Sequence, residues 1–282
     1  MTKVIGIWEA MSHSARRPTI SVVIPALNEE RNLTYLAARI PHDVDEIVFV
    51  DGDSVDKTAA VARELWPNGV HLRQTRKGKG NALACGFAAA SGDIVVMIDA
   101  DGSTDPAEIP RFVGALISGK DFAKGSRFVQ GGGSSDITRL RRLGNWGLNA
   151  LVNTLFATKY TDLCYGYNAF WRDCLDVMDL PDTTMPGPQW GDGFEIESLI
   201  NVRVAASGMQ IAEVSSYELD RIHGASNLNA VKDGLRILWT ILGEFQRARR
   251  RGWKRGVRTE EPGDTAASRY LLDQSLPDVR HA

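Results

Sequence analysis

The sequence predicts an α/β fold, with a mostly parallel sheet flanked by helices in a single domain and an amphipathic helix near the C-terminal end. Over the first half of the chain, short runs of β-branched and other apolar residues alternate with helix-like runs. The 282 residues are 43% hydrophobic and 24% charged, which is typical of a globular protein. Apolar strands separated by helices favour a parallel sheet covered on both faces.

The strands and helices of the first half follow one another from Thr19 onward. β-branched and apolar runs predict strands at ISVVIPA (20–26), DEIVFVD (45–51), VHLRQ (70–74), DIVVMID (93–99) and DFAKGS (121–126). The intervening segments predict helices at 29–40, 55–66 and 80–91, and one that opens near Pro106. This order is repeated βαβ alternation.

The second half is less regular. We expect a helix at 138–156, a strand near 165–171, a proline- and glycine-rich loop at 181–193, a helix through Ser207, a strand at 209–215 and a final helix at 229–249. These elements predict a folded domain at 19–228 and an amphipathic, basic helix at 229–252. The ends, 1–18 and 253–282, are expected to be flexible.

Charge and cysteine content exclude several classes of protein. The formal net charge is −2, so no general basic excess indicates a nucleic-acid partner. The three cysteines have no paired spacing, which argues against a disulfide framework or a cysteine zinc site and favours a reducing, cytosolic compartment. No run approaches the ~20 apolar residues of a spanning helix, and no signal peptide is expected.

Acidic residues follow three of the expected strands. The first strand ends in Asn28-Glu29, the second in Asp51-Gly52-Asp53-Ser54, and the fourth in Asp99-Ala100-Asp101. Because ligands bind beyond the carboxyl ends of strands in such sheets, we expect these ends to converge on one crevice. There Asp51 and Asp53 suit donors on a base or ribose, and Asp99 and Asp101 suit a divalent ion. A turn with a helix cap is the structural alternative for 51–54.

Basic residues form two further candidate sites. The loop from Arg76 to Asn81 precedes a helix, so its backbone N–H groups and a lysine could cradle phosphate. Arg127 follows a strand, and arginines 139, 141 and 142 begin a helix. Arginine can hold an anionic group with two hydrogen bonds. A solvated turn and ordinary surface charge are the alternatives.

A set of motifs in a fixed order resembles the GT-A glycosyltransferases of inverting family 2. The motifs are VVIPALNEE, VDGDSVDKT, KGKGNAL, MIDADGS, GSRF, FEIE and DRIHGASNL, spread over residues 20–229. Within that family they are most similar to the dolichol-phosphate and polyprenyl-phosphate mannose synthases. The resemblance implies a GT-A, Rossmann-like fold and a nucleotide-sugar donor.

The resemblance also implies roles for individual residues. Nucleotide binding falls on Pro25, Leu27, Asn28, Glu29, Asp51, Asp53, Lys79, Asp99 and Ala100. The expected ligands of a Mg²⁺ or Mn²⁺ ion are Asp99 and Asp101, with Ser103 at the position where many members have a glutamine that supplements the metal site. The residues expected to bind the acceptor phosphate are Arg127, Arg141, Asn145, Arg221 and Ser226. Asn145 stands where the family usually has serine, and Asn227 stands where it usually has lysine. The residues expected to act in catalysis are Asp101, Arg127 and Glu197.

The function implied by the resemblance is metal-dependent transfer of a hexose with inversion. Mannose or glucose would pass from a GDP- or UDP-linked donor to a phosphate acceptor, foremost polyprenyl phosphate. An alternative acceptor is a hydroxyl of a small molecule or glycan, with Glu197 or Asp192 as base. A nucleotide-sugar-binding protein without catalysis is a further alternative, which intact Asp99 and Asp101 disfavour.

A lipid acceptor implies contact with a membrane. The final helix carries an apolar face, which packing against the domain would explain, and it runs into a basic stretch at 247–258. Each cation near an anionic surface contributes ~1 kcal/mol of attraction. We therefore expect a cytoplasmic protein with peripheral, salt-sensitive contact at the inner face of the membrane through 247–258.

Overall fold

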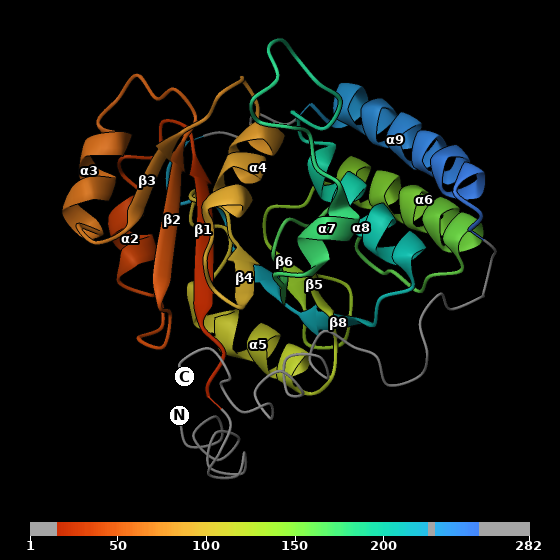
Figure 1. Ribbon diagram of the computed structural model, residues 1–282, viewed down its shortest axis with the longest axis horizontal. Helices are drawn as coiled ribbons and strands as arrows, with labels where there is room; N and C mark the ends of the chain where they lie inside the picture. Colours follow the sequence, from red (N-terminus) through yellow and green to blue (C-terminus); the bar gives the residue numbers. More distant parts are fainter. Residues whose placement is uncertain (1–15, 225–228, 254–282) are drawn as a thin grey trace, which may run out of the picture.

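A seven-stranded sheet forms the centre of the molecule (Figure 1). The computed structural model describes residues 16–224 and 229–253. The strands lie in the order β3 (Val70–Arg73), β2 (Glu46–Asp51), β1 (Ile20–Ala26), β4 (Ile94–Met97), β7 (Asn168–Trp171), β5 (Phe122–Ser126) and β8 (Ile211–Ser215). β7 is antiparallel to both of its neighbours, and the other pairings are parallel. The prediction of a mostly parallel sheet is confirmed.

Helices cover the sheet, and three further helices pack together at one side of it. Helix α4 (Lys79–Ala89) packs on β1 and β2, and α5 (Ile109–Ile117) packs on β5 and β7 after a 3₁₀ turn at Pro106–Glu108. The shorter helices are α2 (Leu33–Ala37), α3 (Thr58–Leu65) and α7 (Cys174–Met178). Beyond β5 and β8 lie α6 (Arg139–Phe156), α8 (Ile196–Ser207) and α9 (Ala230–Arg250), which contact one another (Figure 1). A small parallel pair joins β6 (Gly133–Ser134) to β9 (Tyr217–Glu218).

The apolar residues form two clusters. The larger one contains the buried strands β1 and β4 together with the inner faces of α4 and α5. The smaller one joins α6, α8 and α9 through Val152, Phe156, Val202 and Ile241. These side chains are buried because each helix presents an apolar stripe to its neighbours. The second cluster therefore holds the C-terminal helix against the rest of the molecule.

Several element boundaries differ from the sequence expectation, and α7, β6 and β9 are not among the expected elements. The helix expected at 29–40 is only Leu33–Ala37, and side chains of α3 and of the loop before it bind the backbone at Glu29 and Glu30. The N–H of Glu29 donates to the Thr58 hydroxyl at 2.7 Å, and the N–H of Glu30 contacts Asp56. The strand expected from 165 begins at Asn168, and the carbonyl oxygen of Tyr165 instead accepts from buried Lys124 at 2.6 Å. The expected flexible ends lie almost wholly outside the described residues.

The loop before α8 lies directly on the beginning of α4. The N–H of Gly80 donates to the carbonyl of Asp192 at 2.8 Å, and the Arg76 guanidinium pairs with the Asp192 carboxylate at 2.8 Å. A Cβ atom at position 80 would lie 1.8 Å from the carbonyl oxygen of Gly191. Only glycine permits this approach, which holds the two segments together beside the strand ends.

Replacing Gly80 with alanine should therefore lower stability markedly. The obstructing atom is backbone, so relief requires moving the loop, and we expect a loss of about 2 kcal/mol or more. Gly114 in α5 is the matched control because nothing lies within 4 Å of a Cβ there. Gly114→Ala should be neutral or stabilising by up to ~1 kcal/mol. Urea unfolding of both variants measures the difference, and equal effects would contradict this contact.

Candidate functional site

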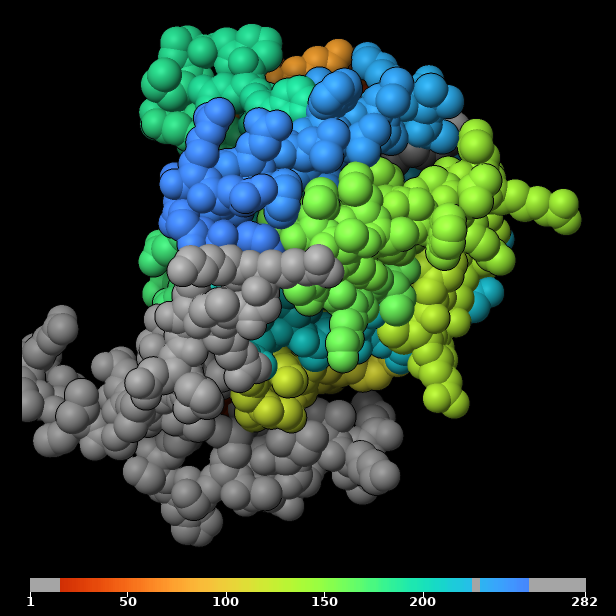
Figure 2. Space-filling view, turned by 90° about the vertical axis from the view of Figure 1, so that its right-hand side faces the viewer, coloured from red at the N-terminus to blue at the C-terminus, as the bar shows by residue number. Residues whose placement is uncertain are grey.

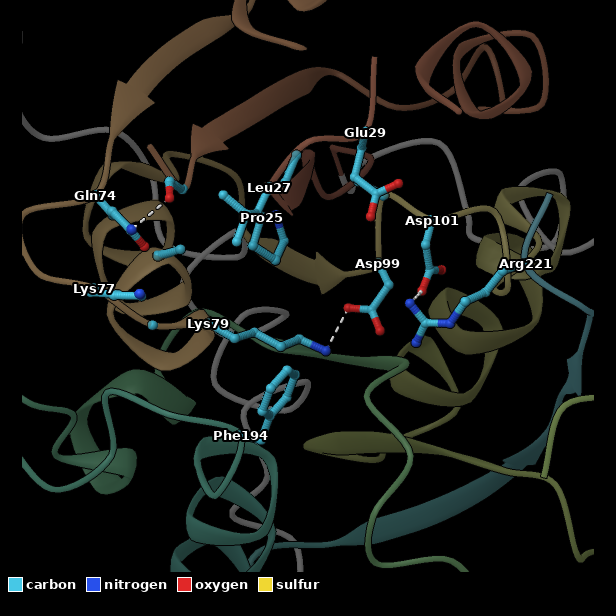
Figure 3. A pocket seen from close by; sticks show the side chains of 15 residues that line it. Pro25, Leu27, Glu29, Gln74, Lys77, Lys79, Asp99, Asp101, Phe194 and Arg221 are labelled. Atoms are coloured by element: carbon cyan, nitrogen blue, oxygen red, sulfur yellow. Dashed lines mark hydrogen bonds and ion pairs between the residues drawn. The ribbon is translucent and has the colours of Figure 1, made fainter. Parts of the chain in front are cut away.

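A pocket of about 400 Å³ opens at the carboxyl ends of β1, β2 and β4 (Figure 3). Its wall combines apolar side chains, three cations and three carboxylates from segments far apart in the chain. The lining residues are Pro25, Ala26, Leu27, Glu29, Gly52, Gln74, Lys77, Gly78, Lys79, Ala82, Asp99, Ala100, Asp101, Phe194 and Arg221. The crevice expected at this edge of the sheet is therefore present.

The β1 side of the pocket is held by hydrogen bonds between neighbouring loops. Asn28 has a φ of 59°, and its side-chain oxygen accepts from the N–H of Val55 at 2.9 Å. Its own N–H donates to the Ser54 hydroxyl at 2.9 Å. Gln74 donates to the carbonyl of Gly52 at 2.8 Å. Asn28 thus supports the wall while Pro25 and Leu27 line it.

The acidic end of β2 does not point into the pocket. Asp53 pairs with Arg73 from the adjacent strand β3 and is about half exposed. The Asp51 carboxylate accepts from the N–H of Ser54 at 3.3 Å. Neither side chain lines the pocket, although Gly52 between them does. Of the three acidic strand ends, the structure brings together those of β1 and β4.

Lys79 joins the pocket to the start of α8. Its Nζ lies 2.6 Å from Asp99 Oδ1 and 2.6 Å from Glu197 Oε1. Burial opposes the charge on Lys79, but the two carboxylates outweigh it and raise the Lys79 pKa. Burial raises the pKa of Glu197, and nearby Asp99 adds to this, against the opposing effect of Lys79. Lys79 therefore stays protonated and neutralises charge at the end of β4.

Asp101 is held from both sides. Its Oδ1 accepts from the backbone N–H and the hydroxyl of Ser103, at 3.0 and 2.7 Å, and its Oδ2 lies 2.7 Å from the Arg221 guanidinium. Ser103 thus orients Asp101 from outside the pocket lining. Each of the two β4 carboxylates carries an ion pair to a cation of the chain itself.

Asp99 and Asp101 fit a divalent cation by the chemistry of their donors. Carboxylate oxygens suit Mg²⁺ and Mn²⁺, and Mg²⁺ commonly takes one or two carboxylates together with substrate phosphates. Within the described ranges, no three histidine, cysteine, aspartate or glutamate side chains form a complete metal site. The remaining ligands would have to come from a bound anion and water.

Glu29 is the pocket carboxyl with the largest resolved change. Burial raises its pKa from 4.5 to about 7, the charges of Asp101 and Asp99 add to this, and the amide of Asn32 and Arg221 oppose it. The Asn32 amide donates to its carboxylate. Glu29 is therefore half protonated near neutral pH in the ligand-free pocket.

The residues expected to bind the acceptor are divided between two places. Arg221 lines the pocket. Arg127 is buried, with Asp162 on its Nε and Nη2 at 2.7 and 2.9 Å and Glu218 on its Nη1 at 2.9 Å. Asn145 donates to the same Asp162 carboxylate at 3.0 Å. The structure thus brings Arg127 and Asn145 together, but away from the pocket lining.

Arg141 and Asp192 also lie apart from the pocket lining. Arg141 pairs with Asp136 at 3.0 Å, and Ser226 lies outside the described residues. Asp192, the alternative base, binds Arg76, which lowers its pKa against the opposing effect of burial. This pairing argues against Asp192 as a proton acceptor.

Sequence reasoning did not single out Gln74 as part of the site, and it named Lys77 only within the candidate loop from Arg76 to Asn81. Gln74 follows a strand as the acidic residues do, and Lys77 belongs to the basic loop already noted. Phe194 lies beside Lys79 in the pocket (Figure 3). Its position depends on the contact between its loop and α4, which no local pattern reports.

The chain belongs to glycosyl transferase family 2, whose family model matches residues 21–178. It is 31% identical over 258 residues to polyprenol monophosphomannose synthase of Mycolicibacterium smegmatis, covering 83% of this chain and 92% of that protein. It is 43% identical over 243 residues to dolichol-phosphate mannosyltransferase of Pyrococcus furiosus, covering 81% of this chain and 66% of that one. The chain is therefore a glycosyltransferase.

Solved structures agree with this assignment. Glucosyl-3-phosphoglycerate synthase from Mycobacterium tuberculosis, in complex with Mn²⁺, UDP and glucosyl-3-phosphoglycerate, matches with a TM-score of 0.62 at 27% identity. The match covers 81% of this chain and 80% of that one. The same enzyme with Mg²⁺ and UDP gives a TM-score of 0.63. The expected GT-A-like fold is confirmed.

The pKa of Glu29 predicts how stability changes with pH. A carboxyl whose pKa is higher in the folded state contributes stability below its unfolded pKa of 4.5, and that contribution is lost as pH rises through about 7. Glu29→Gln removes this dependence. Relative to wild type, the variant should gain stability between about pH 5 and about pH 8 in chelator. Thermal melts across that range measure it, and a constant difference would show that Glu29 titrates normally.

The Lys79 ion pairs predict a structural cost of removing this amine. Lys79→Met leaves Asp99 and Glu197 without their shared cation, and we expect a loss of about 3 kcal/mol. Lys77→Met is the control, because Lys77 lines the same pocket but is exposed; its effect should stay within ~0.5 kcal/mol. Urea unfolding in the absence of metal separates the two. Similar small effects would mean that the Lys79 pairs contribute little.

Proposed function

We propose that this enzyme transfers a hexose from a GDP- or UDP-linked donor to polyprenyl phosphate, with inversion at the anomeric carbon. The observation that carries the proposal is the pocket itself, where two β4 carboxylates face Lys79 and Arg221 beside the apolar β1 wall. That combination suits a nucleoside diphosphate, whose base needs a flat apolar surface and whose phosphates need cations. The names of the mannose synthase relatives support the choice of acceptor.

The chain's own groups divide the work on the donor. Pro25, Leu27 and Gly52 offer the surface for the nucleoside, and Lys77 and Lys79 lie on the phosphate side. Asp99 and Asp101 are the proposed ligands of Mg²⁺ or Mn²⁺, supported by Ser103 behind Asp101. A bound metal ion would neutralise the charge that develops on the departing diphosphate. Because Lys79 and Arg221 already pair with these carboxylates, both cations must shift toward phosphate oxygens when donor and metal bind.

A phosphate acceptor fits the charged side chains around the pocket. Its oxygen attacks the anomeric carbon as the bond to the diphosphate breaks, and a phosphate monoester is already anionic near pH 7. The reaction then needs positioning more than proton removal. We assign this positioning to Arg221, which lines the pocket and would contact the acceptor phosphate together with the donor's diphosphate. Buried Arg127 supports the segment that leads to Arg221, because its guanidinium pairs with Glu218 of that segment as well as with Asp162.

A second acceptor is favoured by the solved relatives. Glucosyl-3-phosphoglycerate synthase has been crystallised with UDP-glucose and phosphoglyceric acid, so a hydroxyl of a small phosphorylated acid is the runner-up. A hydroxyl needs a base, and Glu29, with a pKa near 7, is the pocket carboxyl that suits this task. Offering polyprenyl phosphate and phosphoglycerate side by side decides between them by the radiolabelled product formed.

A lipid acceptor requires contact with a bilayer. In the part of the chain that the structure describes, no helix is long and apolar enough to cross a membrane. We therefore propose peripheral association. Of the basic stretch at 247–258, Arg247 and Arg251 pair with Asp179, and residues 254–258 lie outside the described ranges.

Asp101→Asn should reduce transfer about a hundredfold or more, because it removes a carboxylate ligand of the metal ion that would neutralise the negative charge developing on the diphosphate. Asp53→Asn is the comparison variant: the resemblance assigns Asp53 to the nucleotide, whereas here it pairs with Arg73 away from the pocket. Its activity should stay within about twofold of wild type. Release of nucleoside diphosphate from GDP-mannose and UDP-glucose measures both. Undiminished turnover of Asp101→Asn, or of wild type in chelator, would contradict the metal role.

A further inference from the structure

Large apolar side chains are exposed on the first halves of two helices. Six of them are each between 54% and 69% exposed: Leu140, Leu143 and Trp146 on α6, and Val231, Leu235 and Trp239 on α9. Their spacings of three and four residues place each set on one face of its helix. We call these six residues the α6–α9 face. Two tryptophans at more than 60% exposure are unusual for a surface that faces only water.

The two helices lie side by side and run in the same direction. Phe156 at the end of α6 contacts Phe245 near the end of α9, with ring centroids 5.6 Å apart. Val152 and Ile241, about one turn earlier on each helix, share the same buried cluster. The first halves therefore lie at the same end of the pair. Figure 2 shows α6 and α9 together across one side of the molecule.

Basic residues lie at the end of the α6–α9 face where both helices begin. Arg139, Arg142 and Lys232 are exposed at the start of the two helices, and no aspartate or glutamate occurs anywhere in α6. Asp233 on α9 is occupied, since its carboxylate accepts from the N–H of Asn229 at 2.7 Å. Apolar side chains bordered by cations match the acyl boundary and the phosphates of an anionic bilayer.

The same end of α9 is tied to the pocket. Arg236 lies 2.7 Å from the Glu195 carboxylate and stacks over Trp190 at 4.8 Å. Glu195 directly follows Phe194, which lines the pocket. Arg236 therefore connects the first half of α9, which carries part of the α6–α9 face, to the loop that places Phe194 in the pocket.

We propose that the α6–α9 face docks on the surface of an anionic bilayer, with Trp146 and Trp239 inserted at its interface. The inference rests on the proposed lipid acceptor and names the surface that meets the membrane. Tryptophan and arginine are the side chains that favour this depth, since each has an apolar body and a polar end. A second copy of the chain would bring the exposed cations Arg139, Arg142 and Lys232 of both copies to one interface, whereas an anionic bilayer offers them opposite charge.

The test is co-sedimentation of the full-length chain with vesicles of phosphatidylcholine, alone or mixed with phosphatidylglycerol. Wild type should bind the anionic vesicles. The variant L143Q/W146Q/L235Q/W239Q should bind at least about tenfold more weakly, because four apolar side chains are withheld from the interface. Val55→Gln is the matched control, since Val55 is 93% exposed far from these helices. R249Q/R250Q removes cations at the other end of α9 and should weaken binding less than the fourfold change.

Brominated lipids give a second readout that does not depend on a destabilising change. They should quench tryptophan fluorescence of wild type more than that of W146F/W239F, which keeps the face apolar. Wild type that stays in the supernatant, equal binding by the fourfold variant, or a wild-type dimer that the fourfold variant abolishes would overturn the proposal. Transfer to short-chain polyprenyl phosphate in detergent is measured in parallel. If wild type does not catalyse that reaction, the proposed function is refuted. If wild type catalyses it but does not bind the vesicles, only the docking face is refuted.

Discussion

The arrangement of the site depends on the two ion pairs of Lys79, with Asp99 and with Glu197. Lys79 begins α4, yet its amine lies between Asp99 at the end of β4 and Glu197 at the start of α8. These three elements come from separate parts of the chain, and one protonated amine holds their functional ends together. The neighbouring close approach of Gly80 to Gly191 brings the backbones near enough for this contact. The pocket therefore forms where the ends of β1, β2 and β4 meet the helices of the second half of the chain.

In the ligand-free site, cations and carboxylates of the chain pair with one another in place of the diphosphate and the metal ion. Lys79 and Arg221 compensate Asp99 and Asp101, which would otherwise repel each other and Glu29. Burial raises the pKa of Glu29, and the remaining repulsion from Asp101 and Asp99 adds to it. A diphosphate–metal complex brings both negative and positive charge, so it can exchange partners with these ion pairs without leaving a buried charge unpaired.

Much of the fold could be predicted from the sequence because its strands are continuously apolar and β-branched. The runs that became β1, β2 and β4 stand out for that reason, and so do the acidic residues that follow them. Asp99, Asp101 and Glu29 lie in the pocket because parallel strands end at the same edge. The direction of Asp53 could not be read, since it depends on Arg73 from a neighbouring strand. Arg127 likewise depends on Asp162, which is 35 residues further along the chain.

The most direct measurement is a crystal structure of the protein soaked with Mn²⁺ and a nucleoside diphosphate, with anomalous scattering recorded at the manganese edge. The account predicts a manganese peak in contact with Asp99 or Asp101, a base against Pro25 and Leu27, and Arg221 moved from Asp101 to a phosphate oxygen. A nucleotide bound elsewhere, or bound in this pocket with no manganese and both ion pairs intact, would contradict it.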